Sequence, residues 1–115
     1  MRIFLILLAI PAVIFGQGEK HLKNLKQLTF GGDNAEAYFS PNGKFLSFQS
    51  NNTKWDVKCD QIFNLDIKKA GKDTTYKPPM ISTSEGRTTC SYYLPGNKQI
   101  LFASTHLASR DCPAA

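Results

Sequence analysis

The chain has 115 residues, which is enough for one small domain and no more. Its formal net charge is +5, but the 14 lysine and arginine residues are scattered, and only residues 20–26 hold a cluster. A nucleic-acid-binding protein concentrates positive charge on one face, so we expect a mildly basic solvated surface and no nucleic-acid partner.

Residues 1–16 have the features of a secretory signal-peptide helix. Arg2 gives a basic start, residues 3–15 are almost wholly apolar, and Gly16 offers a small residue for cleavage. The apolar run is shorter than the roughly 18 to 20 residues that span a bilayer, so we expect no stable transmembrane anchor. The alternatives are a membrane anchor and a buried N-terminal helix. We predict export to the periplasm or extracellular space, in association with the cell envelope.

The mature segment begins with three predicted strands, and the second and third of them are predicted to form a β-hairpin. A short strand at 25–30 is followed by a Gly-Gly turn and a second strand at 35–39. Ser40-Pro41-Asn42-Gly43 then favours a tight reversal, because Asn and Gly tolerate positive φ. Residues 45–50 alternate between two faces, which is strand periodicity. Strands 35–39 and 45–50 therefore form a hairpin.

The remaining elements are also predicted to be β structure, with no amphipathic helix after residue 17. Polar loops at 51–59 and 68–77 flank a strand at 61–67, and another short strand follows at 80–83. Residues 88–93 and 99–104 form a second hairpin across Pro95-Gly96-Asn97.

A shift of 54 positions aligns the two hairpins. The matched residues are Tyr38 with Tyr92, Pro41 with Pro95, Lys44 with Lys98, Phe48 with Phe102, and Ser50 with Ser104. The turn glycine moves by one place, from residue 43 to residue 96. These matches indicate two copies of one supersecondary unit. A sheet of this size cannot bury its apolar face alone, so neighbouring units must stack on it.

Four segments carry a resemblance to a known family. Leu28-Thr29, the turn at 39–44, Phe48-Gln49-Ser50 and Gln61-Ile62-Phe63 resemble the TolB-like, WD-type β-propeller repeat. Its usual turn is aromatic-Ser-Pro-Asp-Gly-Lys, and this chain has Asn in place of Asp. The second copy departs further, because Leu94 replaces Ser and Gly96-Asn97 inverts the order. The resemblance spans residues 25 to about 112.

The resemblance implies an all-β, partial β-propeller with the aromatic-Ser-Pro strand innermost. Residues 17–34 would hold an N-terminal segment with a ring-closing strand, 35–83 the first blade, and 84–115 an incomplete second blade. A ring needs roughly four to eight blades, so we expect an N-terminal fragment whose remaining blades belong to a longer parent chain.

The resemblance implies a non-catalytic binding or scaffold module of an exported bacterial envelope protein, with a protein, peptide or glycan ligand. The alternative is the N-terminal propeller domain of a longer exported hydrolase, such as a peptidase, whose catalytic domain lies outside this chain. Fold does not fix function, and the sequence beyond residue 115 discriminates between them.

We expect no enzyme activity from this chain, no cofactor and no metal. Ser82 and Ser84 lack a Gly-x-Ser-x-Gly context, and His21 and His106 complete no ligand set.

Two residues are candidates for ligand binding. Glu36 can bind a ligand cation in the central channel, or it can pair with Arg87 or a lysine, and we favour the ion pair. Trp55 can be an exposed loop anchor for a partner, or it can be tucked over the edge of its own blade, and we favour the second.

Three cysteines remain after cleavage, so one stays free or pairs outside the chain. Export permits a disulfide. The up-and-down blade implied by the resemblance places Cys59, Cys90 and Cys112 near one face, with Cys90 bridging to either of the others if the Cα atoms come within about 7 Å. The sequence does not choose between the two pairings.

Overall fold

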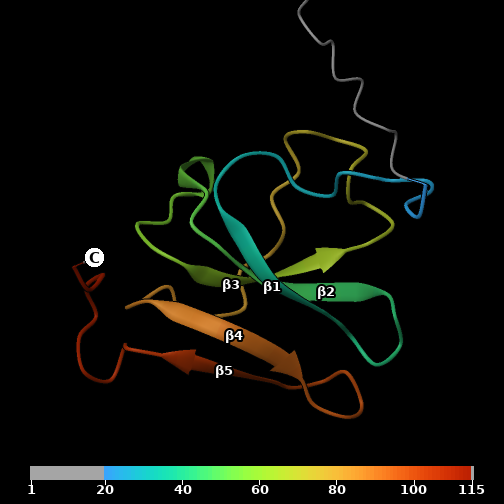
Figure 1. Cartoon of the computed structure of the whole chain (residues 1–115). Helices are drawn as coiled ribbons and strands as arrows, with labels where there is room; N and C mark the ends of the chain where they lie inside the picture. The colour runs from blue at the N-terminus through green and yellow to red at the C-terminus, as the bar shows by residue number, and fades with distance from the viewer. Residues whose placement is uncertain (1–19, 115) are drawn as a thin grey trace, which may run out of the picture.

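Alternating apolar residues and tight polar turns divide the chain into two small antiparallel sheets (Figure 1). The computed structural model describes residues 20–114, so the predicted signal-peptide helix at 1–16 lies outside the described residues. The first sheet has the order β1-β2-β3, with strands β1 (Asn34–Phe39), β2 (Phe45–Ser50) and β3 (Gln61–Asp66). The second sheet pairs β4 (Thr88–Tyr93) with β5 (Ile100–Ser104). Both predicted hairpins are confirmed.

The turn between β1 and β2 is held by its own side chains. Asn42 Oδ1 accepts hydrogen bonds from Ser40 Oγ at 2.8 Å and from the Lys44 amide at 3.0 Å. Ser40 Oγ in turn accepts from the Phe45 amide at 3.0 Å. Gly43 has φ 67°, a left-handed conformation that glycine adopts without steric cost. The Ser-Pro-Asn-Gly sequence therefore fixes this reversal locally.

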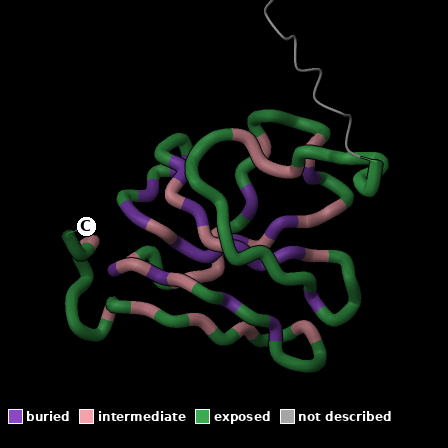
Figure 2. Tube along the Cα trace, viewed as in Figure 1, coloured by how far each residue is buried: buried purple, intermediate pink, exposed green. Residues whose placement is uncertain are grey.

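The hydrophobic core lies on one face of the first sheet. Leu46 and Phe48 point to this face from β2, and Phe63 and Leu65 join them from β3. The loops add three further buried members, Trp55, Val57 and Ala70. The rings of Phe48, Trp55 and Phe63 contact one another, with centroid separations from 4.9 to 6.3 Å. Figure 2 shows this buried cluster within the first sheet and the loops beside it.

Trp55 closes the short 3₁₀ helix η1 (Thr53–Trp55). Asn52 caps the helix by accepting a hydrogen bond from the Lys54 amide at 3.1 Å. This local turn carries the indole inward, where only 6% of the residue is exposed.

The second hairpin packs on the other face of the first sheet, through β4. Gln49 and Ile62 are paired across β2 and β3, so they share this face, and Gln49 hydrogen-bonds to β4. Tyr93 is 6% exposed on β4, whereas neighbouring Tyr92 is 59% exposed, so the two tyrosines point to opposite sides as strand periodicity requires. Strand β5 is largely open to solvent (Figure 2).

Two predicted strands are wrong or incomplete. Residues 25–30 form no strand, because Phe30 offers its carbonyl to the Asn52 side chain, and Thr29 offers its carbonyl to Gln27. The predicted strand at 80–83 is reduced to one bridge between Phe63 and Met80. Two backbone bonds flank that bridge, from the Asn64 amide to Pro79 and from the Ile81 amide to Ile62.

Candidate functional site

Strands β1 and β4 contain the same backbone irregularity at equivalent positions. In each hairpin the pairing register slips by one residue, between Ala35 and Tyr38 in β1 and between Thr89 and Tyr92 in β4. Glu36 has φ 52° and Cys90 has φ 51°, so a non-glycine residue is left-handed in both bulges. Glu36 and Cys90 are separated by the same 54 positions that align the hairpins. The same bulge therefore occurs at equivalent positions of the two hairpins.

The two hairpins contact each other through the equivalent tyrosines of their bulged strands and through their turns. The rings of Tyr38 and Tyr92 meet edge to face, with centroids 5.9 Å apart and planes 67° apart. At the turns, the Asn42 amide donates to Asn97 Oδ1 at 3.0 Å. Strands β1 and β4 thus run beside each other as neighbouring copies.

One glutamine connects the sheets behind the tyrosines. Gln49 Oε1 on β2 accepts hydrogen bonds from the Thr89 hydroxyl and from the Cys90 amide, the latter at 3.3 Å. The bulge of β4 is thereby tied to the first sheet. We call the region formed by Glu36, Tyr38, Cys90 and Tyr92 the inner-strand surface.

Glu36 makes a different contact from the one expected. Its carboxylate accepts a hydrogen bond from the Tyr38 hydroxyl at 2.7 Å. This bond, together with the repulsion between the carboxylate and a phenolate, raises the pKa of Tyr38 above its ordinary value.

The expected ion pair between Glu36 and Arg87 or a lysine is wrong. No lysine or arginine among residues 20–114 lies within ion-pair distance of the Glu36 carboxylate. Arg87, at the start of β4, is 3.6 Å from Asp60 in the loop before β3. Asp60 therefore pairs with the Arg87 guanidinium, and the Glu36 carboxylate stays exposed beside Tyr38 and Tyr92.

Trp55, the other candidate for ligand binding, is part of the core. Its ring packs between Phe48 and Phe63 and presents almost no surface to a partner. The expectation of a tucked indole is confirmed, and a role as an exposed anchor is contradicted.

The disulfide joins Cys59 to Cys112, with Cα atoms 5.9 Å apart, and Cys90 is free and exposed. The predicted pairing of Cys90 with Cys59 or Cys112 is therefore wrong. The reason is positional: Cys90 belongs to the bulge of the inner-strand surface. Cys59 and Cys112 meet where the loop before β3 approaches the segment after β5.

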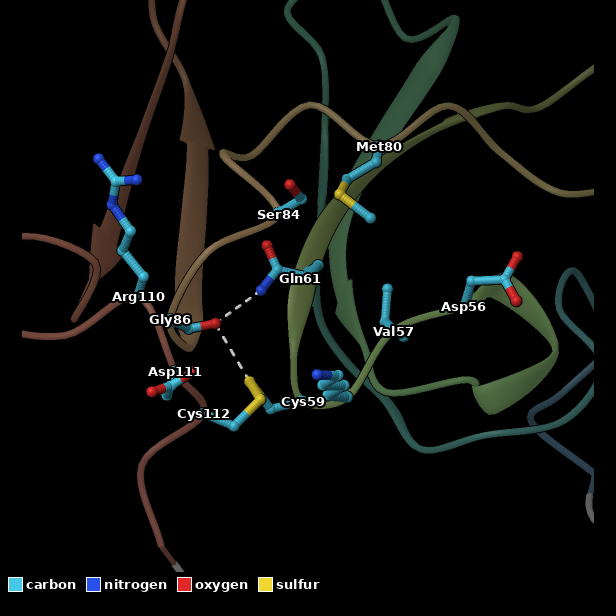
Figure 3. A pocket seen from close by; sticks show the side chains of 11 residues that line it. Asp56, Val57, Cys59, Gln61, Met80, Ser84, Gly86, Arg110, Asp111 and Cys112 are labelled. Atoms are coloured by element: carbon cyan, nitrogen blue, oxygen red, sulfur yellow. Dashed lines mark hydrogen bonds between the residues drawn. A yellow bond between two sulfur atoms is a disulfide. The ribbon is translucent and has the colours of Figure 1, made fainter.

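A polar pocket of about 180 Å³ surrounds the disulfide (Figure 3). The Gly86 carbonyl lies at its centre, where it accepts a hydrogen bond from Gln61 Nε2 at 2.8 Å. Cys59 Sγ lies 3.1 Å from the same oxygen, in a contact without a proton because the sulfur is in a disulfide. Arg110 pairs with Glu85 at 3.6 Å. These groups fasten two segments together and include no nucleophile with an adjacent base.

A second, apolar groove of about 350 Å³ runs beside β1. Leu28 from the N-terminal segment forms one wall, and Ala35 and Ala37 from β1 form another, with Leu46 and Phe48 beneath them. Leu28 also packs against the core. The segment that was expected to be a ring-closing strand thus covers part of this face without pairing with it.

Within the described part of the chain, no group of three or more His, Cys, Asp or Glu side chains is arranged to hold a metal ion. Over the same residues, no helix has the length and apolar character needed to cross a bilayer. Comparison of the chain with protein-family models, with curated proteins and with solved structures gives no match.

Sequence reasoning located Glu36 but missed the surface to which it belongs. The available signal was the alignment itself, because the 54-residue shift places Glu36 on Cys90 and Tyr38 on Tyr92. Neither bulge residue is a glycine, so nothing in the residue types announced a left-handed backbone there.

Proposed function

We propose that this chain is a non-catalytic binding or scaffold module, built as the N-terminal part of a TolB-like β-propeller in an exported envelope protein. One observation carries the proposal: the two hairpins share the same bulge at equivalent positions, and they contact each other through the equivalent Tyr38 and Tyr92 and through Asn42 and Asn97 at the turns. Successive propeller blades stand in this relation, each a small antiparallel sheet stacked beside the last with matching strands innermost.

The arrangement of the first sheet supports the blade interpretation. The order β1-β2-β3 continues outward to the Phe63–Met80 bridge, which occupies the place of a fourth strand. The exposed apolar side chains supply a further reason, since Phe39 is 65% exposed and Leu101 is 66% exposed. Neighbouring repeats stack on apolar strand faces, so exposed apolar surface of this kind is what a further repeat covers. We propose that further blades of a longer parent chain cover it.

The disulfide supports export. Cys59–Cys112 is a bond of the kind that persists in oxidising compartments and is rare in the cytosol. The proposed location is the periplasm or the extracellular space. Fractionation of cells that express the chain with its leader tests this, because export predicts a shortened, oxidised form outside the cytoplasm. A full-length, reduced form in the cytoplasm contradicts it.

We propose the inner-strand surface as the place of binding, because inner strands line the channel of a propeller. Glu36 supplies a carboxylate with no lysine or arginine partner among the described residues, and Tyr38 holds it in position. Tyr92 adds a second aromatic ring, 59% exposed. A carboxylate beside tyrosine rings can bind a guanidinium or ammonium group: the carboxylate forms an ion pair with it, and the rings make cation–π contacts with it. The favoured ligand is therefore a protein or peptide that presents a basic side chain.

The test uses short peptides that differ in one charge. NMR titration with Gly-Gly-Arg-Gly-Gly should shift the ring signals of Tyr38 and Tyr92, and the same peptide with citrulline in place of arginine should bind at least tenfold more weakly, on the scale of one charge-assisted contact. Glu36→Gln should weaken binding of the arginine peptide by a similar factor.

Asp73→Asn is the matched control. It removes the same charge from a loop where the Asp73 side chain bonds only to Thr75 among the described residues, and it should leave binding unchanged. Equal binding by Glu36→Gln and the unmodified chain contradicts the proposal. So does a chitin oligosaccharide that shifts the two tyrosine signals when the arginine peptide does not.

A further inference from the structure

We propose that the Cys59–Cys112 disulfide is a redox-sensitive clamp that docks the second hairpin on the first sheet. Docking places β4 beside β1, so the clamp also assembles the inner-strand surface. That last consequence rests on the proposed function, whereas the clamp itself rests on the distribution of buried residues, the contacts between the sheets and the position of the disulfide.

The cluster of packed apolar residues belongs to the first sheet and the loops beside it. All its buried members fall between residues 46 and 70, and the partly buried residues that pack on it fall between 28 and 80. No side chain of β4 or β5 takes part in that cluster. Burial of apolar surface is the main source of stability, so the second hairpin gains little from this core.

The contact between the two sheets combines two buried apolar side chains, Ile62 and Tyr93, with several polar contacts. Tyr93 donates to Asn64 at 2.6 Å, Gln49 accepts from β4, and the Thr88 amide donates to Asp60 at 2.9 Å. Two buried hydroxyls, Ser47 Oγ and Ser91 Oγ, have no hydrogen-bond partner among residues 20–114. Protein hydrogen bonds replace bonds to water, so each contributes modestly, and an unsatisfied buried hydroxyl opposes docking. A covalent attachment would therefore add to the stability of this interface.

The outer edge of the second hairpin adds none. Leu101 on β5 is 66% exposed, and no strand among the described residues pairs with the free side of β5. A two-stranded hairpin without a partner sheet is marginal in water. Its order consequently depends on whatever holds it to the first sheet.

The disulfide supplies that attachment. Cys59 lies two residues before β3 in the first sheet, and Cys112 follows β5, at a sequence separation of 53. The segment that carries Cys112 is bound back to the start of the hairpin, because the Gly86 amide donates to the Arg110 carbonyl at 2.8 Å. Arg87 donates its amide to Thr105 Oγ1 at 2.9 Å. One covalent bond thus anchors both ends of the second hairpin to the first sheet (Figure 3).

The chemistry of release is thiol–disulfide exchange. Cys59 is buried and Cys112 is half-buried, so a thiolate reaches the Cys112 sulfur first and forms a mixed disulfide with it, releasing Cys59 as a thiolate that takes up a proton. A second thiolate then attacks the reductant sulfur of the mixed disulfide, and Cys112 leaves as a thiolate that also takes up a proton. Two thiols are oxidised to one disulfide, and the protein gains two electrons and two protons.

The test compares the oxidised chain with the chain reduced by dithiothreitol. Hydrogen exchange followed by mass spectrometry should become at least tenfold faster across β4 and β5, and it should change less than twofold across β2 and β3. Trp55 is the only tryptophan and lies in the core, so its fluorescence should not shift on reduction. This readout separates loosening of the hairpin from unfolding of the chain.

Two variants locate the effect. Cys59→Ser combined with Cys112→Ser should show fast exchange in β4 and β5 without reductant, and dithiothreitol should add nothing. Cys90→Ser keeps the disulfide and should respond to reduction as the unmodified chain does. Slow exchange in β4 and β5 after complete reduction overturns the clamp, and so does a simultaneous loss of protection in β2 and β3.

The result is independent of ligand binding. If reduction loosens the hairpin but the oxidised chain does not bind the arginine peptide, the disulfide clamp is supported and the proposed ligand is wrong. If the oxidised chain binds the peptide and reduction leaves exchange and binding unchanged, the clamp fails and the proposed function stands.

Discussion

The first hairpin, β1–β2, and the second, β4–β5, share the same strand bulge but differ in what surrounds them. In both, the register slips at the same place and a non-glycine residue is left-handed in the bulge. Strand β2 lies between two strands and contributes two side chains to the core. Strand β5 has one strand neighbour and exposes Leu101. The difference teaches that local sequence sets the shape of the repeat, whereas its neighbours set its stability.

The turns make the same point at the level of single residues. Gly43 and Asn97 occupy equivalent positions and have φ 67° and 60°, so asparagine takes the left-handed place of the glycine. Each turn is closed by the same backbone bond, from Ser40 to Phe45 and from Leu94 to Gln99, both at 2.9 Å. The reversal survives the loss of the Ser-Pro-Asn-Gly order because these residue types tolerate the required backbone.

Truncation of equivalent phenylalanines should produce the largest difference between the hairpins. Phe48 is 3% exposed and contacts Trp55 and Phe63, so Phe48→Ala should lower the free energy of unfolding by about 3–5 kcal/mol. Phe102 is only half-buried, and Phe102→Ala should cost about 1 kcal/mol or less. Urea denaturation followed by circular dichroism measures both. Equal losses at the two positions would break the comparison.

A smaller effect should come from the polar contact between the sheets. The Tyr93 hydroxyl donates to Asn64 across the interface, so Tyr93→Phe should cost about 1 kcal/mol. Tyr92→Phe is the matched control, since Tyr92 is exposed and its hydroxyl makes no hydrogen bond with residues 20–114. Exchange rates of the β4 amides in the two variants provide the measurement. Equal exchange in both variants means that the Tyr93 hydroxyl does not help to hold the second hairpin.

The smallest effect is electrostatic and concerns the first bulge. The Glu36 carboxylate raises the pKa of Tyr38 above 10.0, so Glu36→Gln should lower that pKa toward its ordinary value. The bond donated by protonated Tyr38 contributes fully below the ordinary pKa and is lost as the pH rises through the raised one. Burial alone raises the pKa of Tyr93, which should therefore stay raised in the variant. Alkaline NMR titration of both rings tests this, and an unchanged Tyr38 contradicts it.

The sequence predicted the elements that short-range chemistry determines. The alternation through Phe45–Ser50 and the turn residues 40–43 each act locally, and the predicted hairpin formed there. Residues 25–30 have strand-like composition, but a strand needs a partner, and their carbonyls bond to side chains instead. Local patterns therefore gave the hairpins and failed where pairing depends on distant residues.

The candidate site was predicted less well, for the same reason. Placing Glu36 on a strand was within reach of the sequence, but its partner depends on which cation or hydroxyl the fold brings near. The disulfide is similar, because Cys59 and Cys112 approach each other only after the segment following β5 folds back onto Gly86. In a chain-entropy account, closing such a loop contributes about 4 kcal/mol. One distant contact can thus compensate for the missing core of the second hairpin.

The central claim is that the hairpins are two copies of one unit, packed with equivalent strands side by side. The most direct measurement is a nuclear Overhauser spectrum of the oxidised chain with assigned tyrosine rings. The account predicts cross-peaks between Tyr38 and Tyr92, whose centroids are 5.9 Å apart, and between the Asn42 amide and the Asn97 side chain. Cross-strand signals within each hairpin, with no signal joining these pairs, would contradict it.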